Sequence, residues 1–320
     1  MVISYRIRAR DARMQYGEAM LDRQQLETLG AVIEHGSFES AARALHVSHG
    51  AVSQRIRALE ESLSAVLLFR EIPVVPTRAG EAVLKHVKQL RLLEQETVQR
   101  VSPPGSPRAR VQIAIAVNAD SLTTWFEPVA WQLTREANIA LEVFVDDQDH
   151  TYALLARGDV IGCVSTKRRT KPSVSFAEEL LGTMHYHCVA SPSFARQHFA
   201  NGLKLPAAVS APAVLFNRKD RLHDVFLTNL FGVEIAEYVR HYVPSPHSLL
   251  AAICEGVGYG LVPQYQCAPL VEASQLTALA PQRTVAVDLY WYHWREEPPL
   301  AAAITRTVIE QAKLRLDAVP

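Results

Sequence analysis

The sequence has 320 residues, which at roughly 100–200 residues per domain predicts two or three domains. Hydrophobic residues make up 48% and charged residues 21%, which excludes a disordered, collagen-like or purely coiled-coil chain. The 33 Lys and Arg balance the 33 Asp and Glu, so any nucleic-acid contact must come from a local basic patch.

The cysteines and the N-terminal segment indicate the compartment. None of Cys163, Cys188, Cys254 and Cys267 has a partner at metal-site spacing, which favours buried, reduced thiols. No apolar run reaches the ~18 residues of a membrane span, and residues 1–20 lack the apolar core of a secretion signal. We therefore expect a cytoplasmic protein without a membrane partner, in which residues 1–20 are a disordered or mis-started extension.

Residues 22–63 carry apolar side chains at helical spacing. Leu26, Leu29 and Ile33 share one helix face, and Ser37 and Ser48 are placed to cap the two helices that follow. Two short helices joined by a tight turn are typical of a helix-turn-helix, although pairs of surface helices are also common. The helix after Ser48 presents hydrogen-bonding side chains and no carboxylate on its outer face, as DNA phosphates and base edges require: His49, Ser53, Gln54 and Arg57.

Charge adds little to this interpretation. The first 100 residues hold 14 Lys and Arg against 12 Asp and Glu, an asymmetry compatible with DNA binding that would not suggest it unaided. Short β-prone pieces then surround Pro73. From Thr77 to Val101 the spacing predicts a long helix with an apolar stripe that needs a partner: Val83, Val87, Leu90 and Val98.

Residues 102–107 contain three prolines and a glycine, which predicts a hinge over 102–108. Beyond it, strands alternate with helices, which favours an α/β sheet with crossover connections. The expected strands are 111–117, 139–145, 160–164, 186–190, 213–216, 260–262 and 285–291. The expected helices are 122–135, 151–156, 225–231, 249–255 and 301–316.

A ligand site is expected where the strand 111–117 ends. The carboxyl edge of an α/β sheet binds ligands, and the amides of a helix N-terminus can hold a carboxylate, here at Ser121 to Thr123. Asp120 and Asp147 each follow a strand and can receive an ammonium or guanidinium group. Helix capping by Asp120 and a solvated loop position for Asp147 remain alternatives.

Other motifs have simpler explanations. The glycines of residues 256–260 follow a helix and precede a strand, the reverse of the phosphate-binding order, so a helix C-cap is favoured. His185 and His187 share one strand face but lack a third metal ligand nearby in sequence. Capping explains the polar residues 220–224, and sheet packing explains the aromatic residues 291–294.

Residues 22–80 resemble the winged helix-turn-helix of LysR-type transcriptional regulators. The residues that carry the resemblance, in order and spacing, are Leu26, Phe38, Ala41, Ala42, Leu45, Val47, Ser48, Ala51, Val52, Ser53, Ile56, Leu59, Glu60, Leu67, Phe69, Arg70, Pro76, Thr77, Ala79 and Gly80. The resemblance implies a wing over 63–76 and a linker helix over 77–101 that pairs two subunits. His49, Gly50 and the wing-tip residues Val74 and Val75 depart from the family pattern, which concerns operator preference rather than DNA binding itself.

The rest of the chain also resembles this family. Residues 255–263 are similar to the glycine-rich turn of its co-inducer domain, and residues 116–125, 145–147, 157–162 and 290–294 are similar to the ArgP/LysG (IciA-type) subgroup. That subgroup senses basic amino acids and activates genes for lysine or arginine export. The resemblance implies a two-lobed, periplasmic-binding-protein-like (type 2) α/β effector domain over 109–320. Its lobes are expected at 109–186 with 286–320, and at 187–285, with two crossings as a hinge.

We thus expect a transcriptional regulator with a winged helix-turn-helix at 21–80, and no enzyme, cofactor or metal site. A different effector, and an architectural DNA-binding protein without an effector, remain alternatives. The expected partners are operator DNA, lysine or arginine, RNA polymerase, and identical subunits in a dimer or tetramer. The expected DNA-binding residues are Ser37, Ser48, His49, Ser53, Gln54, Arg57, Arg70 and Thr77. The expected effector-binding residues are Asn118, Asp120, Ser121, Leu122, Thr123, Asp147, Ser165 and Phe216.

Overall fold

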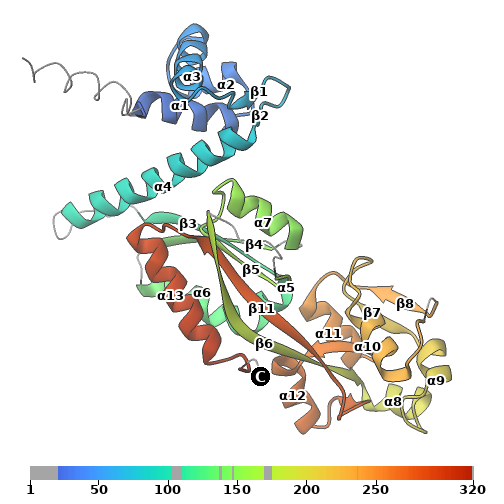
Figure 1. Cartoon of the computed structure of the whole chain (residues 1–320). Coiled ribbons are helices and arrows are strands. Elements are labelled where there is room, and N and C mark those ends of the chain that lie inside the picture. Colours follow the sequence, from blue (N-terminus) through green and yellow to red (C-terminus); the bar gives the residue numbers. More distant parts are fainter. Residues whose placement is uncertain are drawn as a thin grey trace, which may run out of the picture. The chain divides into compact units, whose positions relative to one another are not determined.

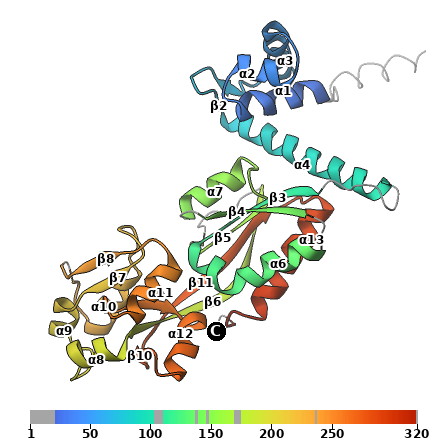
Figure 2. The same ribbon diagram turned by 180° about the vertical axis from the view of Figure 1, so that it is seen from behind.

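The computed structural model describes residues 21–102, 110–136, 139–145, 148–168, 175–235 and 237–318, which are shown from opposite sides in Figures 1 and 2. They form two compact units. The first contains the described residues up to Glu94 together with Ala156–Gly158, and the second contains the others. The division between the units falls within helix α4 (Arg78–Val101). The expected extension at 1–20, and the expected hinge except for Ser102, lie outside the described residues.

The first unit is a helix-turn-helix followed by a wing and a long helix. Its elements are α1 (Arg23–Glu34), α2 (Phe38–Ala44), α3 (His49–Leu63), β1 (Leu68–Phe69), β2 (Val75–Pro76) and α4. The side chains of Asp22, Ser37 and Ser48 accept hydrogen bonds from backbone N–H groups in the first turns of α1, α2 and α3, at 3.0–3.2 Å. These caps fix where each helix begins, and those of Ser37 and Ser48 confirm the sequence prediction.

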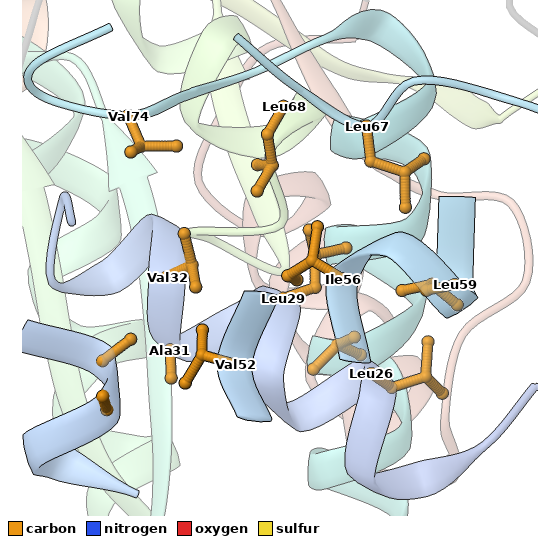
Figure 3. Close-up of a cluster of buried hydrophobic side chains, with 13 residues drawn as sticks. Leu26, Leu29, Ala31, Val32, Val52, Ile56, Leu59, Leu67, Leu68 and Val74 are labelled. Carbon is orange, nitrogen blue, oxygen red and sulfur yellow. The ribbon is translucent and has the colours of Figure 1, made fainter. Parts of the chain in front are cut away.

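A single hydrophobic core holds this unit together (Figure 3). Val52, Ile56 and Leu59 lie on the buried face of α3 and are almost inaccessible to solvent. They pack with residues of α1 and of the wing segment, among them Leu26, Leu29, Val32, Leu67 and Leu68. Because one face of α3 is committed to this core, its opposite face is left open to solvent.

The sequence predicts that the apolar stripe of α4 faces a second subunit, but most of its residues contact the core of their own unit. Val87 is fully buried in the core of the first unit, and Val83 and Leu90 pack against the same core. Of the four residues expected to face a second subunit, only Val98 is strongly exposed, at 62%. Most of the stripe therefore stabilises its own unit.

The second unit is built on a seven-stranded mixed sheet. Its strands are β3 (Val111–Val117), β4 (Ile139–Val145), β5 (Gly162–Ser165), β6 (Phe176–Ala190), β9 (Gly260–Pro263), β10 (Thr277–Ala278) and β11 (Thr284–Trp294). The strand order is β10-β6-β11-β5-β3-β4, and β9 also pairs with β6. The neighbours of β3 are parallel to it, whereas all the pairs made by β6 and β11 are antiparallel. The strand β3 is almost entirely apolar, as a parallel strand covered on both faces requires.

Helices cover this sheet in two lobes. The first lobe carries α5 (Ala119–Ser121), the π-helical turn η1 (Leu122–Phe126), α6 (Glu127–Glu136), α7 (Gln148–Ala156) and α13 (Pro299–Lys313). The second lobe carries α8 (Pro192–His198), α9 (Leu205–Ser210), α10 (Leu222–Phe231), α11 (Pro246–Cys254), α12 (Gln264–Glu272) and the parallel strands β7 (Ala213–Leu215) and β8 (Arg240–Tyr242). The sequence analysis missed α8, α9, α12, β8 and β10. No helix in the described ranges is both long and apolar enough to span a membrane.

The strands β6 and β11 run side by side from one lobe into the other (Figures 1 and 2). β6 is 15 residues long, three times the expected length. Its first part carries carboxylates instead of an apolar pattern: Glu178 pairs with Arg168 at 3.2 Å and accepts a 2.7 Å hydrogen bond from Tyr292. Backbone pairing with β11 covers this first part of β6, which hydrophobic alternation does not reveal.

Close packing explains the glycines at residues 256–260. Only Gly256 adopts a positive φ, +76°, where the preceding helix ends. A Cβ at Gly258 or Gly260 would lie 2.6 Å from the carbonyl oxygen of Pro212 or Val214. The expected C-cap role therefore holds for Gly256 alone, and the other two allow β7 to approach the start of β9.

Candidate functional site

The exposed face of α3 gathers several of the predicted DNA-binding side chains. His49, Gln54 and Arg57 are exposed and Ser53 is half-buried, and of these Gln54 and Arg57 lie on the side of α3 away from the core. The ring of His49 lies 6.2 Å from that of Phe38 in α2, which ties the start of α3 to the preceding helix. The N-terminal part of the exposed face carries hydrogen-bond donors that match what the major groove accepts, whereas Glu61, an exposed carboxylate, lies one turn beyond Arg57.

Three predicted residues also cap helices. The hydroxyls of Ser37 and Ser48 accept from Ser40 and Ala51. Thr77 donates to the carbonyl of Val66 at 2.7 Å and accepts from the N–H of Gly80 at 3.1 Å, at the start of α4. The donor capacity of Thr77 is already used within the unit, whereas the serine hydroxyls retain a proton that they can donate to a phosphate.

The wing presents one cation and an apolar tip. Arg70 is exposed, and its guanidinium lies 5.8 Å from the ring centroid of Phe38, so it stays close to the helix-turn-helix. At the tip, Ile72 is 97% exposed. This wing can offer an electrostatic contact at its base and an apolar contact at its tip.

The second unit contains a cavity between its two lobes. The space inside it that a water-sized molecule can occupy is about 30 Å³, within about 430 Å³ of empty volume that includes open solvent, so the lobes enclose little room in this structure. Its walls come from α5, β6, β7, the start of α10, α11, β9 and α12. The lining residues are Asp120, Tyr186, Val214, Leu215, Phe216, Asp220, Leu222, His223, Pro246, Leu249, Leu261, Val262, Pro263 and Gln266.

Asp120 stands at one end of this cavity, directly after β3. Its Oδ2 accepts a 2.7 Å hydrogen bond from the hydroxyl of Tyr186, a buried residue of β6. Removal from water raises the pKa of the Asp120 carboxyl, the nearby charge of Asp220 raises it further, and the Tyr186 hydrogen bond opposes both. Asn118, not Asp120, occupies the N-cap position of α5, so the alternative that Asp120 caps this helix is wrong.

Asp220 supplies the second carboxylate from the other lobe. Its Oδ1 accepts from the N–H of Leu222, the first residue of α10, at 2.9 Å, although Arg221 and not Asp220 occupies the N-cap position of this helix. Burial raises the pKa of Asp220 as well, and the neighbouring Asp224 adds to the rise. None of the described residues that line the cavity is Lys or Arg. Two acidic groups in a partly desolvated space without a cation form a site for a positively charged ligand.

The structure brings only part of the predicted effector-binding set to this cavity. Asp120 and Phe216 line it. Thr123 does not line the cavity, but its Oγ1 accepts a 3.2 Å hydrogen bond from the side chain of Gln266, which does. Asn118, Ser121, Leu122 and Ser165 do not line the cavity, and the hydroxyl of Ser165 instead accepts from the N–H of Lys167 at 3.2 Å. Asp147 lies outside the described residues.

The cavity also contains polar residues that the sequence analysis missed as ligand groups: Tyr186, Asp220, His223 and Gln266. Asp220 and His223 were assigned to helix capping, and nothing local in sequence distinguishes them from ordinary residues at a helix start. Tyr186 and Gln266 become recognisable only once β6 and α12 are placed opposite α5.

The two strand histidines do not act together. His185 Nε2 lies 3.4 Å from Asp317, whereas His187 Nε2 lies 3.2 Å from the side-chain oxygen of Gln264. Within the described ranges, no three His, Cys, Asp or Glu side chains are grouped as a metal site would require.

Comparison with known families covers both units. Residues 23–81 match the bacterial regulatory helix-turn-helix protein, lysR family, and residues 92–313 match the LysR substrate binding domain. The two matches correspond to the helix-turn-helix with its wing and to the two-lobed unit with its cavity.

Individual relatives extend over nearly the whole chain. The transcriptional regulator LysG of Mycobacterium bovis is 38% identical over 292 residues, which cover 91% of this chain and 93% of that protein. The crystal structure of ArgP from Mycobacterium tuberculosis is 37% identical, with a TM-score of 0.83 over 94% of this chain and 100% of that one.

A ligand-bound structure is also similar. It is the full-length LysG from Corynebacterium glutamicum with bound effector Arg, 33% identical with a TM-score of 0.79, covering 92% of this chain and 99% of that one. Family matches to both units, and relatives above 30% identity along nearly their full length, place the function with DNA-binding regulators and not with enzymes. The chain belongs to the LysR family of transcriptional regulators and is similar to its ArgP and LysG members.

Proposed function

We propose that this regulator senses a basic amino acid, lysine or arginine, in the cavity between the lobes and controls a gene for amino-acid export. The observation that carries the proposal is the pair of carboxylates, Asp120 and Asp220, on a cavity wall without Lys or Arg. The α-ammonium and the side-chain cation of such a ligand would each offset the charge of one carboxylate and form charge-assisted hydrogen bonds with it.

The relatives support the same ligand class. The LysG structure from Corynebacterium glutamicum holds arginine as its effector. Its likeness to this chain extends over both units, and the cavity described above has the charge that such a ligand needs. The exporter as target gene rests on the resemblance to the ArgP/LysG subgroup alone.

DNA binding and assembly complete the proposal. Recognition of the operator is assigned to the exposed face of α3, with Arg70 of the wing beside it. Two subunits pair through α4, and the resulting dimer, or a tetramer of two such dimers, binds the operator and contacts RNA polymerase. The lobes, which we place at 109–186 with 286–320 and at 187–285, change their relative angle when the ligand binds, with β6 and β11 as the connections.

Calorimetry on the full chain tests the ligand. Lysine and arginine are titrated beside norleucine and citrulline, which match them in shape but lack the side-chain cation. We expect binding of at least one basic amino acid and of neither neutral analogue. Asp120→Asn and Asp220→Asn should each weaken that binding by roughly ten- to a hundredfold, the equivalent of one charge-assisted hydrogen bond.

Glu272→Gln provides the matched control, because Glu272 is an exposed carboxylate of α12 outside the cavity. It should bind like the wild type. Absence of binding by any basic amino acid would leave a LysR-type regulator with a different effector. Operator binding and regulation that no ligand alters would instead indicate an architectural DNA-binding protein.

A further inference from the structure

His223 is a buried residue on the wall of the cavity, and its two ring nitrogens form no hydrogen bond with the described residues. Its side chain is 2% exposed, and neither Nδ1 nor Nε2 has a hydrogen-bond partner. A buried donor or acceptor without a partner is costly, so proteins rarely keep one unless a ligand or water completes it. The residue lines the same cavity as Asp120 and Asp220.

The surroundings of His223 hold the imidazole in place and keep it neutral. The ring stacks on Tyr238 with centroids 5.6 Å apart and packs edge-on against Tyr259 at 5.1 Å. Burial is the main cause that lowers the pKa of His223 to about 4, the charge of Asp224 opposes it, and the charge of Arg240 acts in the same direction as burial. A neutral imidazole carries one N–H donor and one acceptor.

Asp224, the carboxylate next to His223 in sequence, is occupied elsewhere. It accepts hydrogen bonds from Tyr238 at 2.8 Å and from Arg240 at 3.1 Å, and it pairs with Arg221 at 3.0 Å. It does not line the cavity. The imidazole is therefore left for whatever enters the cavity.

The other side-chain donors on the cavity wall are engaged. The hydroxyl of Tyr186 donates to Asp120, and the amide of Gln266 donates to the hydroxyl of Thr123. Among the described lining residues, His223 is thus the side-chain N–H or O–H donor without a protein acceptor. A zwitterionic ligand whose cations face two aspartates still needs such a donor for its carboxylate.

We propose that His223 binds the α-carboxylate of the amino-acid effector and so selects amino acids over amines that carry the same side-chain cation. His223 lies on the cavity wall in the first turn of α10, where Asp220 already accepts the N–H of Leu222, so the bond to the carboxylate is assigned to the imidazole and not to the helix N-terminus. This inference rests on the proposed function, because it names the residue that binds the α-carboxylate of the amino acid proposed there as effector.

A cycle of variants and ligands tests the assignment on the full chain. The ligands are arginine and agmatine, which differ by the carboxylate, with lysine and cadaverine as a second pair. His223→Phe keeps a stacked ring but removes the hydrogen bonds, whereas His223→Asn and His223→Gln each restore an amide donor near one ring nitrogen. His241→Phe is the control, because His241 is exposed on β8 outside the cavity.

In the wild type we expect arginine or lysine to bind more tightly than its amine. His223→Phe should weaken binding of the amino acid by about ten- to a hundredfold and leave binding of the amine nearly unchanged. At least one of the two amide variants should recover part of the preference. Thermal unfolding of each variant monitors the fold.

The outcomes separate the two proposals. If the wild type binds a basic amino acid but His223→Phe weakens amino acid and amine by the same factor, or neither, His223 has no carboxylate role and basic amino-acid sensing stands. If the wild type binds no basic amino acid, the proposed function fails and this assignment fails with it.

Discussion

Because the pKa values of Asp120 and Asp220 are raised, the affinity for the proposed effector should depend on pH. Burial raises the pKa of both carboxyls. The residues that face Asp120 are Tyr186 and Asp220, while Asp220 meets the backbone of Phe216 and Leu222 and the charge of Asp224. A cation binds the ionised form of each aspartate, so protons and effector compete for the site. Lysine and arginine side chains stay charged over pH 5–8, so a change in affinity there reports on the protein.

We therefore predict that effector affinity is highest at the alkaline end of this range and falls as the pH drops through the raised pKa values. Binding in the lower part of the range should release protons, which calorimetry detects as a heat that depends on the ionisation enthalpy of the buffer. Asp120→Asn should bind more weakly and show a flatter pH profile. A wild-type affinity that rises as the pH falls would contradict the carboxylate assignment.

Base-reading residues of α3 give a second prediction at this scale. Gln54 and Arg57 are exposed on the outer face of the helix. Loss of a base-contacting side chain should weaken operator binding by about 1–3 kcal/mol and relax preference at one base position. Footprinting and binding isotherms on Gln54→Ala and Arg57→Ala measure both effects. Arg306→Ala, an exposed arginine of α13, is the charge-matched control. Wild-type behaviour of both α3 variants would refute the recognition-helix assignment.

At the scale of elements, a charged network fixes α1 to the long helix α4. The guanidinium of Arg91 contacts Glu27 through two nitrogens, at 2.6 and 2.9 Å, and Glu34 through the third at 2.6 Å. Its side chain is 29% exposed, so the pairs are partly shielded from water. Arg23 bridges Glu27 at 2.7 Å and Glu94 at 2.5 Å and extends the network along both helices.

Arg91→Ala should therefore destabilise the DNA-binding unit by about 1–3 kcal/mol, because it removes the partner of Glu34 and one of the two arginines that pair with the half-buried Glu27. Arg43→Ala is a matched control in the same unit. Its pair with Glu39 spans 3.7 Å between side chains that are more than 70% exposed, and such pairs contribute about 0–1 kcal/mol. Denaturant unfolding of the two variants compares these effects, and equal losses would mean that the network adds nothing.

The elements that the sequence predicts well are those with local signals. The helices α1 to α3 carry both an apolar face and a side-chain cap, and the apolar strand β3 begins and ends at its expected residues. The start of β6 was missed because its carboxylates Glu178 and Glu179 show no apolar alternation. The cavity residues were likewise predicted only where a local signal marks them. Asp120 follows a recognisable strand, whereas Tyr186 and Asp220 reach it only through tertiary structure.

At the scale of the whole molecule, the exposed apolar residues of α4 bear on assembly. Val87 is fully buried inside the DNA-binding unit, and Val83 and Leu90 are partly buried against the same core, which leaves less of the expected stripe for a contact between subunits. Val98 and Val101 remain 62% and 73% exposed. They are three residues apart and so lie on one face of the helix. This shifts the expected pairing surface to the C-terminal end of α4.

Substitution of both valines by aspartate should then break the dimer that we propose. A carboxylate buried at an apolar contact without a partner costs several kcal/mol, and each 1.4 kcal/mol raises the dissociation constant tenfold. Light scattering at micromolar concentration should show a dimer or tetramer for the wild type and a shift towards monomer for Val98→Asp with Val101→Asp. Val257→Asp, at a 45% exposed valine of the effector unit, should assemble like the wild type. A monomeric wild type would exclude pairing through α4, and an unchanged double variant would place the contact elsewhere on the chain.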